Sequence, residues 1–183
     1  MKKIFLLTLI ILLLCGCEKA VPEYLVSGVL VDKVGDEYAV YFEAIIVNTE
    51  TTKQTLKILK GKGETIYSAV EDIEKQVTQP LLMSHSGVIV VSEDISQNDL
   101  REVCEYAQNS GITLSAYMIK TENADKLFET KPLSSACVGY DIMGLIKQNI
   151  RYKNRLFEVM GGDYKASLPT INVKDGGLVF EGD

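Results

Sequence analysis

Residues 87–92, G-V-I-V-V-S, form a short apolar run between polar residues, which predicts a central strand buried on both faces. The segment after it carries apolar residues at three- and four-residue steps, which predicts a helix capped by Ser96 or Asn98 and ending near Gly111. Residues 112–120, I-T-L-S-A-Y-M-I-K, are predicted as the next strand. A strand, a helix and a strand in this order indicate two parallel strands joined by a right-handed crossover.

Upstream of this unit, two strands rich in β-branched residues predict an antiparallel hairpin. The strands are residues 24–32 and 38–47, and the short turn between them contains Gly35. Residues 48–63 are polar and lack a firm period, so we expect a loop that ends in a strand-like tail. Apolar residues at helical spacing over 66–77 then predict an amphipathic helix.

Downstream of the crossover, periodicity and turn residues predict further helices and a final hairpin. They are a short helix at residues 123–129, a longer one opened by Ser134 or Ser135 and ending near Ile150, a short element at 156–159, and two strands at 168–173 and 177–180. Two strands alone are marginal, so this hairpin is expected to pack on the rest of the chain. The fold class we expect is α+β: a mixed β-sheet, with an antiparallel hairpin plus parallel strands, flanked by α-helices.

The first residues of the chain have the layout of a bacterial lipoprotein signal peptide. Lys2 and Lys3 make a positive start, residues 4–14 are apolar except for one threonine, and the run ends in L-C-G-C at residues 14–17. A helix over residues 4–14 is about 16 Å long against a hydrocarbon core of about 30 Å, too short for a permanent span. The alternative is an ordinary secretion signal in which Cys17 stands by chance.

Lipidation at Cys17 would place the protein on a membrane. Cleavage after residue 16 leaves Cys17 as the first residue, and its thiol would carry a diacylglyceryl group, whose acyl chains hold a domain stably on the extracytoplasmic face. The mature part then has 17 basic against 25 acidic residues, because the leader holds two of the 19 basic ones and none of the acidic ones. A formal charge of −8 argues against a nucleic-acid partner.

Catalytic and metal-binding candidates are few. His85 is the single histidine of the chain, so a histidine-based metal cluster is excluded, and we expect neither a metal nor a cofactor. Ser84 or Cys104 paired with His85 is a conceivable nucleophile arrangement, but a lone histidine before a buried strand is more often a hydrogen-bonded structural residue. The run K-G-K-G at residues 60–63 lacks the other positions of a phosphate-binding loop and is interpreted as an ordinary loop.

The remaining cysteines and the tyrosines each leave two interpretations open. Cys104 and Cys137 are expected to be buried thiols, with a disulfide as the alternative outside the cell. Tyrosine suits interfaces that have one apolar and one wet side. The tyrosines considered for such a surface, with packing at the edge of the core as the favoured alternative, are Tyr106, Tyr117, Tyr140 and Tyr152.

Four local strings carry a family resemblance through their order along the chain. They are the lipobox followed by residues 23–32 (E-Y-L-V-S-G-V-L-V-D); residues 63–69 leading to 82–85 (L-M-S-H) and 88–93 (V-I-V-V-S-E); residues 124–129 (A-D-K-L-F-E) with Ser134 and Ser135; and residues 168–169 (L-P) followed by 177–180 (G-L-V-F). In this order they resemble the Ger(x)C family, the C-subunit lipoproteins of spore germinant receptors. The likeness covers nearly the whole mature chain.

The resemblance implies both a domain division and a function. Residues 1–16 are expected to be the signal peptide, residues 17–160 the Ger(x)C-like N-terminal α/β domain, and residues 161–183 a stub resembling the start of a second domain, as in a truncated form. The expected function is that of a non-enzymatic, lipid-anchored subunit of a germinant receptor in the inner spore membrane. Its partners would be the polytopic membrane subunits of that receptor. The alternative is a surface lipoprotein that captures a solute for a transporter, and a hydrolase is the third possibility.

Overall fold

The structure of the protein is a computed structural model, which describes residues 23–47, 53–133, 136–149, 154–161 and 168–181. The strands in these ranges are β1 (Glu23–Val34), β2 (Glu37–Val47), β3 (Gln54–Gly63), β4 (Leu81–Leu82), β5 (Val88–Ser92), β6 (Tyr117–Thr121), β7 (Thr170–Lys174) and β8 (Gly177–Glu181). The helices are α2 (Ile66–Glu74), the 3-10 helix η1 (Met83–His85), α3 (Gln97–Asn109), α4 (Val138–Gln148) and α5 (Leu156–Gly161).

One mixed sheet connects all of these strands. Their order is β3-β2-β1-β5-β6-β7-β8, with β4 paired beside the start of β1. The neighbours β1–β2, β2–β3 and β7–β8 are antiparallel, whereas β1–β5, β5–β6 and β6–β7 are parallel. The expected α+β class, with a hairpin beside parallel strands, is therefore confirmed.

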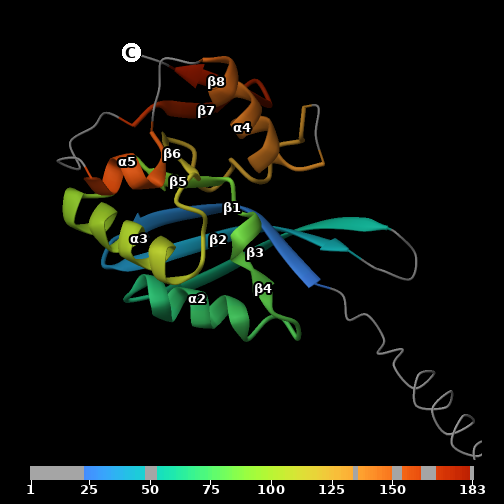
Figure 1. Cartoon of the computed structure of the whole chain (residues 1–183), viewed down its shortest axis with the longest axis vertical. Helices are drawn as coiled ribbons and strands as arrows, with labels where there is room; N and C mark the ends of the chain where they lie inside the picture. The colour runs from blue at the N-terminus through green and yellow to red at the C-terminus, as the bar shows by residue number, and fades with distance from the viewer. Residues whose placement is uncertain (1–22, 48–52, 134–135, 150–153, 162–167, 182–183) are drawn as a thin grey trace, which may run out of the picture.

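Helices cover both faces of the sheet, which divides the core into two layers. Figure 1 shows α2 and α3 on one side of the sheet and α4 on the other. In β5, Ile89 and Val91 belong to the layer under α2, α3 and α5, while Val88 and Val90 belong to the layer under α4. All five residues of β5 are buried, so the prediction of a central strand covered on both faces is confirmed.

The amino ends of α2 and α3 are closed by capping boxes. Thr65 accepts the backbone N–H of Ser68, whose hydroxyl in turn accepts the Thr65 N–H. Ser96 and Asp99 form the same reciprocal pair at the start of α3. Of the two predicted caps for α3, the structure uses Ser96.

The polar stretch before α2 is a strand rather than a loop. Residues 54–63 form β3, which pairs with β2 along its whole length, so the loop prediction for residues 60–63 is wrong. The glycines of K-G-K-G are needed because α2 lies directly on β3. A Cβ placed on Gly61 would stand 2.0 Å from the backbone oxygen of Ala69, and one on Gly63 would stand 2.6 Å from the Ala69 nitrogen.

Three further boundaries differ from the predictions. Strand β6 begins only at Tyr117, because residues 112–116 form the turn that brings the chain from α3 to the sheet. Residues 124–129 form consecutive turns instead of a helix, although Leu127 and Phe128 are buried as expected. Helix α4 begins at Val138, and the proposed caps Ser134 and Ser135 lie outside the described residues.

The final hairpin extends the same sheet. Strand β7 lies parallel to β6, where Lys120 faces Thr170 and donates its backbone N–H to the Pro169 oxygen at 2.9 Å. The expectation that this hairpin packs on the rest of the chain is confirmed, and the division at residues 160 and 161 stays a prediction. In the ranges that the structure describes, the helices are too short or too polar to cross a bilayer.

Candidate functional site

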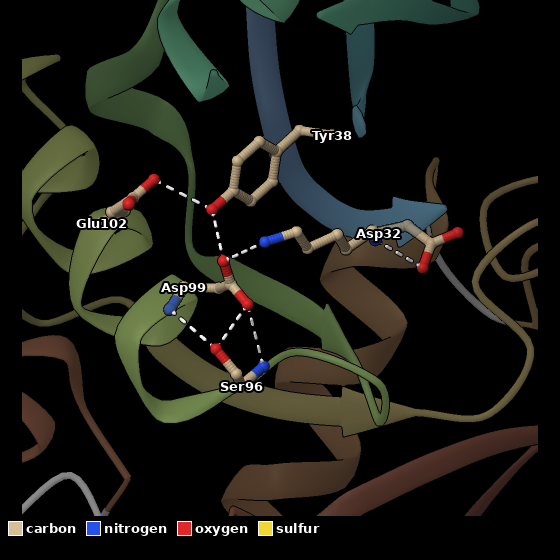
Figure 2. Close-up of polar contacts among 6 residues, drawn as sticks. Asp32, Tyr38, Ser96, Asp99 and Glu102 are labelled. Carbon is tan, nitrogen blue, oxygen red and sulfur yellow. Dashed lines mark hydrogen bonds and ion pairs between the residues drawn. The ribbon is translucent and has the colours of Figure 1, made fainter. Parts of the chain in front are cut away.

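A charged cluster joins the β1–β2 turn to the start of α3 (Figure 2). The Lys33 Nζ lies 2.5 Å from Asp99 Oδ1 and 4.9 Å from the centre of the Tyr38 ring. The Tyr38 hydroxyl lies 2.6 Å from Asp99 Oδ1 and 2.9 Å from Glu102 Oε2, so two carboxylates share its proton. The other Asp99 oxygen accepts the Ser96 hydroxyl at 2.5 Å and the Ser96 backbone N–H at 3.2 Å.

The electrostatics of this cluster fix the ionisation of its members. Burial, the largest single effect, raises the pKa of Asp99, but the hydrogen bonds from Lys33, Ser96 and Tyr38 together hold it well below its ordinary value. Burial, followed by the bonds to Asp99 and Glu102, raises the pKa of Tyr38 well above its ordinary value. Asp99 is therefore a carboxylate and Tyr38 a neutral phenol at neutral pH.

The cluster holds the hairpin turn against α3. The Asp99 side chain is 9% exposed and has donors on both oxygens, while the Lys33 side chain is 28% exposed and partly faces solvent. A carboxylate with a lowered pKa is a poor general base, and a phenol with a raised pKa is a poor acid. This arrangement suits positioning of the turn better than proton transfer.

Replacing Asp99 with asparagine is expected to lower the free energy of unfolding by about 2 kcal/mol at pH 7, because a charged hydrogen-bond acceptor is lost. The pKa of Asp99 is lowered in the folded state, so its contribution is present above the unfolded pKa of about 3.9 and is lost as the pH falls below it. Urea titrations from pH 7 to pH 2 should therefore show the difference between wild type and D99N shrinking in acid.

The matched control for this prediction is Asp94→Asn. Asp94 is an exposed carboxylate shortly before the same helix, and its loss should change stability by less than about 0.5 kcal/mol. A difference between wild type and D99N that stays constant down to pH 2 would contradict the ionic role of Asp99.

A second polar cluster lies inside the core, at the start of α4. Glu43 of β2 is fully buried, and its two carboxylate oxygens accept the backbone N–H groups of Val138 at 2.6 Å and Gly139 at 2.7 Å. The Ser27 hydroxyl on the neighbouring strand donates to the same carboxylate at 2.8 Å. Glu43 thus caps a helix that lies 95 residues away in the chain.

Burial dominates the ionisation of this carboxyl group. Desolvation raises the pKa of Glu43 above its ordinary value, while the hydrogen bonds from Gly139, Ser27 and Val138 lower it by a smaller amount. The close packing also accounts for the glycine at position 139. A Cβ there would stand 2.9 Å from Glu43 Oε2 and 3.1 Å from the backbone oxygen of Ser27.

The structure does not bring the predicted nucleophile candidates together as a site. His85 and Ser84 are exposed on η1. Cys104 is a fully buried residue of α3. Cys137 is also fully buried, at the start of α4, and neither thiol forms a disulfide. Burial raises the pKa of both thiols to about 11, which makes them poor nucleophiles at neutral pH.

The proposed lipidation site and one tyrosine cannot be placed. Cys17 and Tyr152 both lie outside the described residues. Tyr106 is buried at the edge of the core, and Tyr117 is half-buried. Tyr140 is 37% exposed.

Sequence reasoning missed both polar clusters. Glu43 could have been found from the sequence. It is the one charged residue inside the run Y-A-V-Y-F-E-A-I-I-V, and a charge buried there needs a partner. No sequence pattern indicates the cluster of Lys33, Tyr38 and Asp99, because these residues meet only after the hairpin and α3 are folded. Within the part of the chain that the structure describes, His, Cys, Asp and Glu side chains do not gather into a group that could hold a metal ion.

A protein-family model matches most of the chain. Residues 23–164 match the family model described as spore germination protein N-terminal domain. No curated protein and no solved structure matches the chain. The matched segment begins at the first residue of β1 and contains the hairpin, the crossover, α4 and both polar clusters.

Proposed function

Because the chain belongs to the family of spore germination protein N-terminal domains, we propose that it is a lipid-anchored, non-enzymatic subunit of a spore germinant receptor. The family match confirms the resemblance to Ger(x)C proteins and supports a role in spore germination. The observation that carries the proposal is the extent of this match, over residues 23–164, directly after a sequence with a lipobox. The lipid anchor, the receptor and its polytopic membrane partners are the proposed part.

The proposed anchor lies close to the folded domain. Cys17 precedes Glu23, the first residue of β1, by six residues. Six residues span at most about 21 Å when extended, which is less than the thickness of a bilayer with its headgroups. A domain on such a tether would stay beside the membrane and beside integral-membrane partners.

A positioning role agrees with the polar clusters of the domain. The Asp99 and Glu43 carboxylates are both buried and both hold one element of the fold against another. Cys137 lies beside the buried Glu43 carboxylate, where burial raises the pKa of its thiol to about 11, and His85 is exposed on η1. These observations support an assembly subunit.

The anchor is tested by replacing Cys17 with serine. Wild-type protein expressed in its host is expected in the membrane fraction, with the mass of a diacylglyceryl group on its first residue. C17S is expected to keep its leader uncleaved and to carry no diacylglyceryl group, and spores that carry it should respond weakly to nutrient germinants. Cys15→Ser, which removes the neighbouring cysteine two residues earlier, should leave processing and fractionation unchanged. Recovery of the wild type with an unmodified first residue would refute the proposal.

One observation favours the solute-binding alternative. A cleft of about 370 Å³ lies between α2 and α3, and two glutamates and two tyrosines are among its lining residues: Tyr67, Glu71, Glu74 and Tyr106. This volume is at the lower end of ligand-binding pockets. A rise in the melting temperature with a small cationic solute, lost in E71Q/E74Q, would favour this second function.

A further inference from the structure

The parallel strands place their amino ends at one edge of the sheet, which we call the amino edge. Strands β1, β5 and β6 run in the same direction, so the starts of all three point to this edge; Gly28, Val88 and Tyr117 are level with one another, and Glu23 lies five residues further out along β1. Glu23 is also the first described residue after the proposed lipid anchor. Under the proposed function, the amino edge is therefore the side of the domain that the tether holds toward the bilayer.

A small basic pocket opens at the amino edge. It has a volume of about 250 Å³, and Lys147 and Arg155 line it together with Thr113, Ser115 and Tyr117. The Arg155 guanidinium lies 5.3 Å from the centre of the Tyr117 ring. Cations and hydroxyl donors in a shallow pocket are the groups that recognise a phosphate.

The charge of this pocket contrasts with that of the whole protein. Lys147 and Arg155 are the charged residues among those that line it, and none of the lining residues is acidic, in a mature chain of formal charge −8. Among the described residues, the Glu158 carboxylate accepts the Arg155 backbone N–H at 3.0 Å. That bond closes the first turn of α5 and leaves the guanidinium on the Tyr117 ring.

Two large apolar side chains are exposed beside the pocket. Leu114 and Phe157 are each 49% exposed. They belong to adjacent segments, because the Phe157 backbone N–H donates to the Leu114 oxygen at 3.1 Å. Apolar side chains next to lysine, arginine and tyrosine are the combination found where proteins enter the interface of a bilayer.

We propose that the amino edge docks on anionic phospholipid. Lys147 and Arg155 bind the headgroup phosphate, and Leu114 and Phe157 enter the boundary between headgroups and acyl chains. The exposed apolar pair selects a lipid over free phosphate, because a free ion gains nothing from it. This inference rests on the proposed anchor, since a tether to Cys17 brings the amino edge to the surface.

The test uses the mature chain without its lipid, residues 17–183 with Cys17→Ser, which contains the entire described core. Its binding to vesicles of equal parts phosphatidylglycerol and phosphatidylcholine is measured by flotation and compared with pure phosphatidylcholine. Binding is expected only to the anionic vesicles, although a chain of this net charge should be repelled by them. K147E/R155E is expected to bind at least about tenfold more weakly, since each basic residue near such a surface contributes about 1 kcal/mol.

The matched control reverses two exposed charges at the opposite edge. Lys62 lies one residue before the end of β3 and Lys126 lies in the turns after β6, on the carboxyl side of both strands, and K62E/K126E should bind like wild type. L114S/F157S is expected to lose binding with its charge unchanged. Circular dichroism and thermal unfolding establish that each variant is folded.

Three results would overturn the inference. They are absence of binding by the wild type, equal loss in K62E/K126E and K147E/R155E, and displacement by inorganic phosphate at matched ionic strength, which would make the pocket a site for the free ion. The chain in these measurements has no lipid, so their failure leaves the Cys17 anchor, tested by fractionation, unaffected.

Discussion

Replacing Glu43 with alanine is expected to lower the free energy of unfolding by about 3 kcal/mol or more, the largest effect of a single polar substitution in this chain. The variant leaves the backbone N–H groups of Val138 and Gly139 without their acceptor inside the core, while the Ser27 hydroxyl keeps the backbone oxygen of residue 43 at 3.0 Å. Each unsatisfied buried donor costs about 1–3 kcal/mol. Urea unfolding followed by circular dichroism measures the loss.

Glu43→Gln separates hydrogen bonding from charge. Glutamine keeps one carbonyl acceptor for α4, so its loss should be about half that of E43A. The pKa of Glu43 is raised in the folded state, so wild type loses stability as the pH rises from the unfolded value of about 4.3 through the folded one. E43Q should lack this slope. Equal stability of E43A and wild type would contradict the capping role.

Replacing Gly61 with alanine is expected to cost about 3 kcal/mol by overpacking. The new Cβ would stand 2.0 Å from the Ala69 oxygen and 2.8 Å from Ile73 Cγ1, and the first of these atoms belongs to the backbone of α2. The helix must move away from β3, which opens the core beneath it. Thermal and urea unfolding should both show the loss.

Gly144→Ala is the control for Gly61→Ala. Gly144 lies inside α4, and a Cβ there would meet nothing within 4 Å. Alanine in a helix is favoured over glycine by about 0.5–1 kcal/mol, so this variant should be slightly more stable than wild type. A Gly61→Ala protein as stable as wild type would show that α2 does not press on β3.

The elements that local patterns could predict are those whose own side chains face the core. The hairpin, β5 and α3 were predicted because alternation, an apolar run and helical periodicity reflect burial directly. Strand β3 was missed because it is an edge strand of the sheet, where half of its residues face solvent. Its glycines also hid it, because they are needed for the close approach of α2. The helix predicted at 123–129 failed because three buried residues at helical spacing, Ala124, Leu127 and Phe128, also fit a series of turns.

The polar clusters could not be predicted because their partners are distant in the chain. Asp99 meets Lys33 across 66 positions, and α4 begins at Val138 because the cap is Glu43, 95 positions earlier. Local reasoning looked for that cap among the serines just before the helix. A charged residue in an apolar strand is the sequence signal that would have indicated a distant partner.

The place of β1 inside the sheet determines how the domain withstands a pull on its first residue. Strand β1 is bonded along one side to β2 and along the other to β4 and β5. Hydrogen bonds between antiparallel strands lie perpendicular to the strand direction, so tension applied at Glu23 along β1 loads the bonds to β2 in shear. Those bonds must then fail together rather than one after another, which makes this attachment point mechanically strong.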